Sequence, residues 1–500
     1  MLVCVGLTAV AGLLVLIALR LPYPFPLEWQ EGAVVEHARR VCAGRSIYVE
    51  PSLDFAPFPY PPLFHWLGAV ALWCLGSGAD TAPGAALGAL RGVSVLATLA
   101  LLSLVVSVAV RRRTAAHGGP SPPLLRAARA AFAAGLIAAG SGFGGWFLDL
   151  ARVDALMLAC TVAAGLVAQR ARSPVGALAA AVCAALAVMA KQTALLPCAA
   201  LALGLGARAP RLAAVYGVAL VTGLAVMLLW ADALTDGWAS FTIVKLLAGS
   251  PWHAPAVWGF WREASVAFAP VLLLPLGAHW RRAAALNGPT PLAARSTADP
   301  LLRPGAAGTD RCMSFLALGL AAAAWTGRAH EGGFDNTLLP LVVAVALIAP
   351  RWLDGRPVTH VLATVGLVWL AVVGGDPRAV VPTAAQRVAT ERAVEALRAL
   401  PAPAFVPDAP DLAQRAGHPL VVHAMAIVDL LKSRERGVAQ AFVERLEAAL
   451  EAQSFGAVVL DEPWDLPALG ANYMERGALE VPAPCSGAPR VPRLVYVRRR

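Results

Sequence analysis

The chain has few charged residues and no sequence signature of a nucleotide- or zinc-dependent soluble enzyme. Of its 500 residues, 14% are charged and 58% are hydrophobic, whereas an ordinary soluble domain is about 25% charged. Walker, Rossmann and zinc signatures are all missing, and the sequence has no internal repeat. The eight cysteines are scattered, five of them within or beside apolar runs, which favours small core residues over metal ligands. The low charge and the missing signatures therefore indicate a membrane protein.

Apolar runs long enough for membrane helices recur along the first three quarters of the chain. Twelve candidates are seen, at 3–21, 62–77, 88–110, 126–144, 153–171, 175–190, 193–207, 211–233, 256–280, 313–329, 334–350 and 357–374. The first lacks a basic leader and a cleavage site, so we expect a retained helix. The segment 62–77 is short and follows Pro61-Pro62, so it either crosses or lies in the interface.

The positive charges choose between these two alternatives, because loops rich in Arg and Lys stay in the cytoplasm. If 62–77 does not cross, the loops at 111–129, 170–172, 208–211, 281–311 and 351–356 share one side and hold sixteen arginines with three carboxylates. If it crosses, the rule is broken throughout. We therefore predict eleven crossings in the plasma (inner) membrane, with the N-terminus in the cytoplasm and the C-terminus outside.

The last 120 residues differ in composition and predict a second domain. Residues 380–500 hold 14 basic and 14 acidic residues, with helical patterns at 383–399, 422–432 and 437–452 and strand patterns at 455–460 and 494–497. We expect a membrane domain over 1–375 and a small α/β extracytoplasmic domain over 380–500. The segment 283–311 is predicted to be a flexible cytoplasmic linker. The net charge of +10 lies in the membrane part, which indicates topology and not nucleic-acid binding.

The first outward loop, 22–87, carries a concentrated group of charges beside the bilayer, which marks a candidate site. From Glu31, the residues Val34, Val35, Ala38 and Val41 recur at helical spacing, which predicts an interfacial helix with its apolar side in the headgroups. Glu28 and Glu31 lie at its start. They are either catalytic carboxylates or acids that merely favour a helix N-terminus.

Other polar residues fall on turns that face the same side under this topology. Each one alone is also compatible with a solvated turn. Together they form a surface with acidic and fixed positive charge, suited to a lipid phosphate and a hydroxyl to be deprotonated. The predicted site residues beyond the two glutamates are Arg39, Asp149, Arg152, Asp154, Lys191, Gln192, His330, Asp335 and Asn336.

At these residues the chain resembles membrane glycosyltransferases of the GT-C superfamily. The matching pieces are LEWQEG, AGRSIY, FPYPPL, DLARVD, AKQTAL and HEGGFDN, within residues 1–375. The nearest likeness is the RgtA/B/C/D-like branch, with aminoarabinose transferases and protein O-mannosyltransferases as relatives. Relatives commonly carry an Asp-Glu pair in the first loop with the Asp as catalytic residue. Here Gln30 precedes Glu31, so the catalytic role would pass to Glu28 or Glu31.

The resemblance implies transfer of a sugar from a polyprenyl-phosphate donor to a glycan, lipid or protein of the cell envelope, with inversion. A carboxylate, Glu31 or Glu28, would be the base, and Arg152, Lys191 and His330 would hold the donor phosphate. Some relatives use Mg²⁺ or Mn²⁺, but nothing in these residues dictates a metal. Two alternatives stay open: a secondary transporter, which should show paired halves and mid-membrane charges, and a non-catalytic protein that binds lipid-linked glycans.

Overall fold

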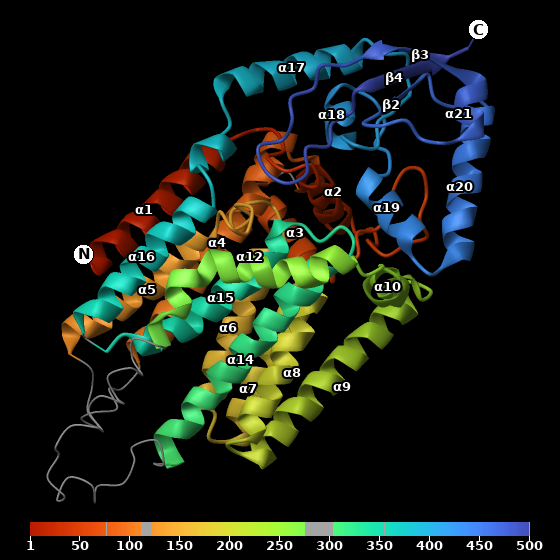
Figure 1. Ribbon diagram of the computed structural model, residues 1–500. Coiled ribbons are helices and arrows are strands. Elements are labelled where there is room, and N and C mark those ends of the chain that lie inside the picture. Colours follow the sequence, from red (N-terminus) through yellow and green to blue (C-terminus); the bar gives the residue numbers. More distant parts are fainter. Residues whose placement is uncertain (77, 112–121, 276–303, 355, 500) are drawn as a thin grey trace, which may run out of the picture.

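The computed structural model of the protein describes residues 1–76, 78–111, 122–275, 304–354 and 356–499. It shows a mostly helical molecule with a small sheet near the C-terminus (Figure 1). Each of the twelve predicted apolar segments contains a helix. The helices of this part are α1 Leu2–Arg20, α2 Glu31–Cys42, α3 Leu63–Cys74, α4 Pro83–Val110, α5 Pro123–Gly140, α6 Asp154–Arg170, α7 Pro174–Ala190, α8 Leu195–Gly206, α9 Pro210–Leu234, α12 Ala254–Leu272, α14 Pro304–Ala329, α15 Leu339–Ile348 and α16 Pro357–Val373.

Short helical turns connect several of these helices. One segment between α9 and α12 changes from α-helix to π-helix and back, over α10 Trp238–Ser240, η3 Phe241–Lys245 and α11 Leu246–Ala248. π-helical turns are rare in proteins, but those that occur are often found at functional sites. The 3₁₀ turns are η1 Gly78–Asp80, η2 Gln192–Ala194, η6 Asp335–Leu338, η7 Ala349–Trp352 and η8 Pro377–Val380.

The polytopic α-helical membrane fold expected from composition is confirmed, while the number of crossings stays a prediction. Among the described residues, five helices are long and apolar enough to cross a membrane (α1, α4, α5, α9 and the 311–329 part of α14), or six if the bent pair of α16 and the helices at Pro377–Arg398 is one span. A crossing needs about 20 residues, and α3 has only 12. However, α8 has 12 residues and α15 has 10, and both lie in segments that were predicted to cross, so helix length alone does not decide whether 62–77 crosses.

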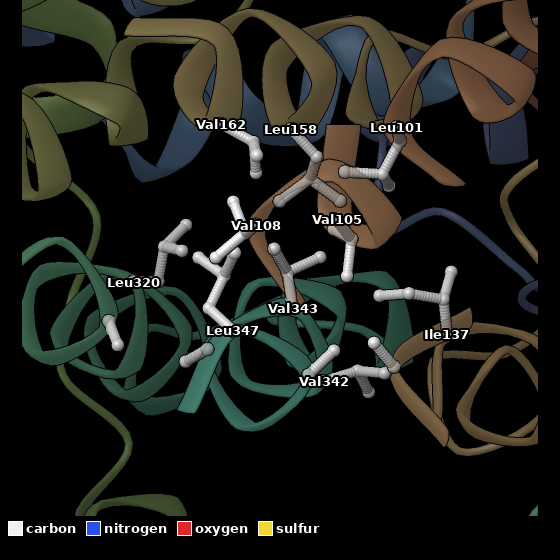
Figure 2. Close-up of a cluster of buried hydrophobic side chains, with 14 of the residues drawn as sticks. Leu101, Val105, Val108, Ile137, Leu158, Val162, Leu320, Val342, Val343 and Leu347 are labelled. Carbon is white, nitrogen blue, oxygen red and sulfur yellow. The ribbon is translucent and has the colours of Figure 1, made fainter. Parts of the chain in front are cut away.

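The core of the helical part lies between five helices that meet far from the sheet. Figure 2 shows Val105 and Val108 of α4, Val162 of α6, Leu320 of α14 and Val343 of α15 turned toward one another. Close approach of the backbones is allowed by small residues, since a Cβ added at Gly165 would lie 2.5 Å from Leu316 Cδ2. Packing of this kind, through small residues, is typical of helices in membranes.

The arginine-rich turns lie together at one end of the helices. Arg208 donates to the carbonyl oxygens of Gln169 and Ala168, and Arg311 donates to that of Ala207. In Figure 1 the turns from α6 to α7 and from α8 to α9 lie at the lower end, whereas α2, α3 and the sheet lie at the other. For these described turns, the position at one end agrees with the predicted grouping, while 112–121 and 281–303 lie outside the described residues.

The C-terminal residues form the small α/β unit that the sequence predicted. Its sheet has the order β1-β2-β4-β3, with β1 parallel to β2 and the other pairs antiparallel. The predicted helices and the two predicted strands are found within one or two residues of their expected bounds. The elements are α17 Ala384–Arg398, β1 Ala404–Phe405, α18 Pro410–Arg415, α19 Ala424–Lys432, α20 Arg436–Glu451, β2 Ala457–Leu460, α21 Pro467–Asn472, β3 Tyr473–Ala478 and β4 Leu494–Arg498.

The helix α2 differs from the interfacial helix predicted in the opening loop. Val34 and Ala38 are fully buried in protein, in one core with Phe64 of α3 and with Ile427 of α19. His37, expected on the polar face, is also buried. The prediction that the apolar side enters the headgroups is therefore wrong, because the C-terminal unit covers this loop. In Figure 1 the blue helices α18 and α19 lie beside α2.

The predicted linker is only partly testable. Residues 283–303 lie outside the described residues. Residues 304–311 begin helix α14, so this part of the linker prediction is wrong. Helix α14 runs from these residues into an alanine-rich stretch, and Ala is the best helix former.

Candidate active site

Glu28 lies in the turn before α2 and is the carboxylate best placed for chemistry. Its side chain is 2% exposed. Oε2 accepts a hydrogen bond from the Gln30 backbone N–H at 3.1 Å and faces Arg152 Nη1 at 3.3 Å. None of the described residues donates a hydrogen bond to Oε1. One carboxylate oxygen is thus held in place and the other is free to accept a proton.

Burial raises the pKa of Glu28 to about 7, and the charge of Arg152 offsets only part of that rise. Nearby Glu31 and Asp154 raise it further. A carboxylate that titrates near neutral pH suits a general base, since catalytic efficiency is greatest when the pKa lies near the working pH.

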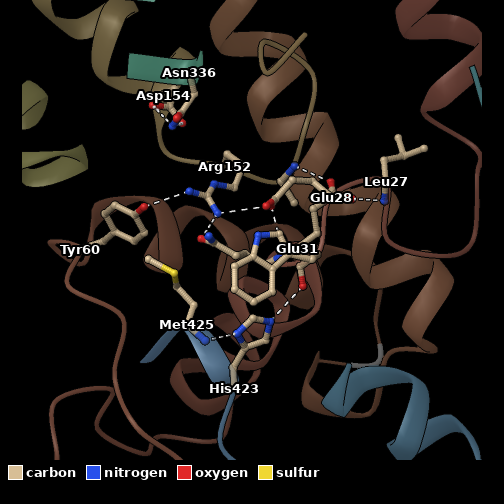
Figure 3. Close-up of polar contacts among 12 residues, drawn as sticks. Leu27, Glu28, Glu31, Tyr60, Arg152, Asp154, Asn336, His423 and Met425 are labelled. Carbon is tan, nitrogen blue, oxygen red and sulfur yellow. Dashed lines mark hydrogen bonds and ion pairs between the residues drawn. The ribbon is translucent and has the colours of Figure 1, made fainter. Parts of the chain in front are cut away.

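Arg152 is the centre of the polar contacts. It comes from the loop between α5 and α6, and Figure 3 shows its guanidinium between Tyr60 and Glu28. Nη2 donates to the Tyr60 hydroxyl at 2.9 Å, and Nη1 donates to Gln30 Oε1 and to Glu28. Its Nε is buried without a partner among the described residues. The predicted site residues Glu28 and Arg152 are therefore together, and Gln30 is oriented by the same guanidinium.

Glu31 is buried and fully paired, which the sequence did not indicate. The sequence placed it among the charges of the first outward loop, and it is 0% exposed. Arg91 of α4 contacts both carboxylate oxygens, at 2.9 Å and 2.7 Å. The backbone N–H groups of Leu27 and Ala151 donate to them at 2.7 Å and 2.8 Å. Burial alone would raise the pKa of Glu31, but Arg91 and these N–H groups outweigh it and lower the pKa.

A second polar group joins three predicted residues from three elements. Lys191, between α7 and η2, places Nζ 2.6 Å from Asp154 Oδ1. Asn336 Nδ2 donates to both oxygens of Asp154, each at 3.2 Å. Gln192 donates to the backbone oxygens of Pro59 and Ile243. The charge of Asp154 also interacts electrostatically with Arg152. This group therefore adjoins the Glu28 group, and Figure 3 shows residues of both.

Four other predicted residues lie elsewhere in the structure. Asp149 pairs with Arg20 at 3.2 Å. Asp335 pairs with Arg328 at 3.2 Å. His330 bonds to the Thr326 carbonyl and stacks against Trp252, with ring centroids 4.4 Å apart. Arg39 donates to the Thr81 carbonyl and to Gln414. Among the described residues, none of these four contacts Glu28.

The structure also adds residues that the sequence reasoning missed. Arg91 interrupts an apolar helix, and a charge in such a run is a usable signal. Tyr60 lies in the quoted FPYPPL piece but was not singled out. His423 and Met425 reach the site from the C-terminal unit (Figure 3), and His423 Nε2 lies 3.0 Å from the Trp29 carbonyl. These last two were hidden because the tail was read as a separate domain.

The chemistry of this donor set does not fit a bound metal ion. Within the described ranges there is no group of three or more His, Cys, Asp or Glu side chains that could hold one. The carboxylates that converge here face Arg91, Arg152 and Lys191. These carboxylates are thus already paired with positively charged side chains, whereas Mg²⁺ or Mn²⁺ would need them as oxygen ligands.

The fold matches crystal structures of ArnT from Cupriavidus metallidurans. The structure bound to undecaprenyl phosphate gives a TM-score of 0.56 at 13% identity, and the apo structure gives 0.53 at 14%. Both alignments cover 98% of this chain and 97% of the other. No family model and no curated protein sequence matches the chain. At this level of identity the two matches show that the chain shares the fold of these ArnT structures, as the resemblance found in the sequence predicted.

Proposed function

We propose that the protein is a membrane glycosyltransferase that moves a sugar from a polyprenyl-phosphate donor to a hydroxyl group of a cell-envelope acceptor, with inversion. The observation that carries this proposal is the Glu28–Arg152 pair, a carboxylate with a pKa of about 7 and a guanidinium 3.3 Å from it. The likeness to a fold that holds undecaprenyl phosphate in ArnT supports the choice of donor lipid.

Glu28 is the base in this mechanism. Its free Oε1 takes the proton of the acceptor hydroxyl while the hydroxyl oxygen bonds to the anomeric carbon of the donor sugar. The bond from that carbon to the phosphate oxygen breaks, and the phosphate leaves with the electron pair. One displacement of this kind inverts the anomeric centre. The proton ends on Glu28, and no metal takes part in any step.

Arg152 and Lys191 hold the leaving phosphate. A phosphate beside lipid needs fixed positive charge, because low polarity strengthens an ion pair and penalises an unpaired anion. The guanidinium has a buried Nε without a described partner, and an Arg fork can bond two phosphate oxygens at once. The Lys191 side chain is 11% exposed, so its head is within reach of a ligand. His330, which bonds to the Thr326 carbonyl away from these two residues, is the third candidate.

Glu31 has a positioning role in this proposal and is not the base. Its four hydrogen bonds fix the start of α2 to α4 and to the loop that carries Arg152. Because Glu28 lies three residues earlier and its carbonyl accepts from the Glu31 N–H, this anchor sets where Glu28 points.

The first experiment measures turnover without knowledge of the acceptor. Purified protein is given a labelled undecaprenyl-phosphate sugar together with a membrane extract, and release of undecaprenyl phosphate and label in the extract are followed. A transporter would move the intact donor between leaflets of a vesicle, and a binding protein would retain it. Either of those results, with no bond cleaved, would contradict the proposed function.

The second experiment tests the phosphate contacts by direct binding of undecaprenyl phosphate. Lys191→Ala should weaken binding by about 1.5–3 kcal/mol, the usual free-energy contribution of a hydrogen bond to a charged group. Lys191→Arg should recover only part, since the two cations differ in shape. The control is Arg387→Ala, an exposed α17 residue paired with Glu391. Equal binding by Lys191→Ala, Arg152→Ala and the control would remove both cations from the site.

A further inference from the structure

A pocket separate from the Glu28 group opens between the first loop and the C-terminal unit. About 530 Å³ of space that no atom fills lies between its walls, open solvent included. Tyr23, Phe25 and Trp29 form one wall, and Asp408 and Arg490 lie on the C-terminal side. An aromatic wall with a few convergent polar groups is typical of small-molecule sites.

Asp408 gives the pocket a fixed hydrogen-bond acceptor. The residue is 3% exposed, and its Oδ2 accepts from the Asp461 backbone N–H at 3.0 Å. In the described part of the chain nothing donates to Oδ1. Asp411 lines the same pocket, and its buried Oδ2 likewise has no partner among the described residues. A buried acceptor without a donor is costly, so the Asp411 oxygen, together with the open Oδ1 of Asp408, indicates a ligand with hydroxyl or N–H donors.

The charges of the pocket select the kind of ligand. Asp408 and Asp411 supply two carboxylates, whereas Arg490 supplies one guanidinium, which already stacks over Trp29 at 5.7 Å and faces Glu462 at 3.5 Å. Arg415 lies over the Phe25 ring at 4.6 Å and balances the second carboxylate, so the pocket has no net positive charge to attract a phosphate or carboxylate group. An uncharged ring with several hydroxyl groups fits, because its C–H face packs on aromatic side chains and its hydroxyls donate to the carboxylates.

The pocket adjoins the proposed base. Pro26 and Trp29, which flank Glu28 in the chain, line it, and so does Cys485. The next residue, Ser486, donates its N–H to the Leu27 carbonyl at 2.8 Å. Gly487 then lies so close over Glu28 that an added Cβ would be 3.1 Å from Oε1. A ligand in the pocket is therefore separated from the base only by this short segment.

We infer that this pocket is the subsite for an uncharged sugar ring of the acceptor, with Asp408 accepting hydrogen bonds from its hydroxyl groups. The inference rests on the proposed function and narrows it, because it makes the acceptor a carbohydrate and not a protein side chain or a simple lipid. The donor phosphate and the acceptor sugar then lie on opposite sides of Glu28.

The test uses binding and not turnover, so that the two proposals fail separately. Full-length protein in detergent is mixed with a panel of uncharged methyl glycosides, and bound glycosides are found by saturation-transfer NMR. Asp408→Asn keeps an acceptor for the Asp461 N–H but turns a donor toward the pocket. It should weaken glycoside binding roughly ten- to hundredfold, the effect of losing a hydrogen bond to a charged group. Asp465→Asn, an exposed carboxylate of the same unit, is the matched control.

A second variant fills the pocket without changing charge. Ala483 lines the mouth and is exposed, so Ala483→Trp should abolish glycoside binding and leave the fold intact. Undecaprenyl phosphate binding should be retained in both variants. If no glycoside binds to the unaltered protein, or if both variants bind as well as the control, the subsite is overturned. If glycosides bind through Asp408 while undecaprenyl phosphate does not bind at all, the subsite stands and the proposed donor fails.

Discussion

Two glutamates three residues apart have opposite surroundings at the site. Glu28 contacts one guanidinium nitrogen and keeps one oxygen free, whereas Glu31 is closed off by four donors. The sequence identified both residues as candidates but could not rank them. The difference depends on Arg91, 60 positions away, and on a backbone N–H 120 positions away. Local pattern carries no information on such partners.

At Glu28 we predict loss of turnover without loss of stability. Glu28→Gln should lower the rate roughly 10²–10⁴-fold, the usual effect of removing a general base. The ionised form is disfavoured by burial, since the pKa is raised from 4.5 to about 7. Ionisation therefore destabilises the fold as pH rises between these values, and the Gln variant should be at least as stable as the unaltered protein at pH 8.

The same titration predicts the pH dependence of the reaction. A base must be ionised, so the rate should rise with pH up to about 7 and then level off. The residual rate of Glu28→Gln should lack this rise. Turnover is measured by release of undecaprenyl phosphate and stability by thermal unfolding in detergent. A variant with full turnover, or one that keeps the same pH profile, would show that another group is the base.

At Glu31 we predict the reverse, a loss of stability. Removing one partner of a buried ion pair leaves the other unpaired, which costs about 3–5 kcal/mol. Glu31→Gln should therefore unfold at a clearly lower temperature. The lowered pKa of Glu31 has the same sign: its stabilisation is present at neutral pH and is lost as pH falls through the folded-state value. Glu391→Gln, from an exposed α17 pair, is the control and should change the unfolding temperature little.

Among the elements, the connection between β3 and β4 packs against the base from the C-terminal unit, through Gly487. It has no regular structure and reaches down from the sheet to the opening loop, where Ser486 bonds to Leu27 and to Arg20. Sequence patterning predicted β4 and the main helices because their apolar repeats are strong. It missed β1, which has two residues, and β3, whose side chains are mostly exposed. It also could not show that this connection covers the site.

Gly487 provides the test of that contact. Its φ is +78°, and an added Cβ would lie 2.5 Å from Glu28 Cγ, so Gly487→Ala should displace the Glu28 side chain and lower turnover. The matched control is Gly375→Ala, at φ +81° with nothing within 4 Å of the added Cβ. Both variants carry similar backbone strain, so Gly375→Ala controls for that part of the loss, and Gly487→Ala should lose additional stability through the clash with Glu28. Equal turnover in the two variants would show that the connection does not position Glu28.

For the whole molecule, the sequence predicted the class, the fold and the grouping of the turns, because these follow from hydrophobic runs and charge bias. It treated the C-terminal unit as separate from the catalytic part. In the structure, Phe64 and Val34 of the opening region share one core with Val422 and Ile427 of that unit. Contacts of this kind join residues almost 400 positions apart, and composition alone does not reveal them. The residues proposed for the reaction all lie in the first part, and the C-terminal unit covers them through His423 and Gly487.

The last prediction concerns which end of the molecule faces the cytoplasm. The structure gathers the arginine-rich turns at one end and the site with the C-terminal unit at the other, but the assignment of sides rests on the positive-inside rule. Alkaline phosphatase is active only outside the cytoplasm, so a fusion after residue 500 should be active and a fusion after Arg172, in the turn from α6 to α7, inactive. The donor phosphate and acceptor would then meet on the outer face. The opposite activities would mean that the whole molecule is inverted, with the N-terminus outside and Glu28 on the cytoplasmic side, because the contact between Glu28 and Arg152 keeps the residues before and after 62–77 on one side.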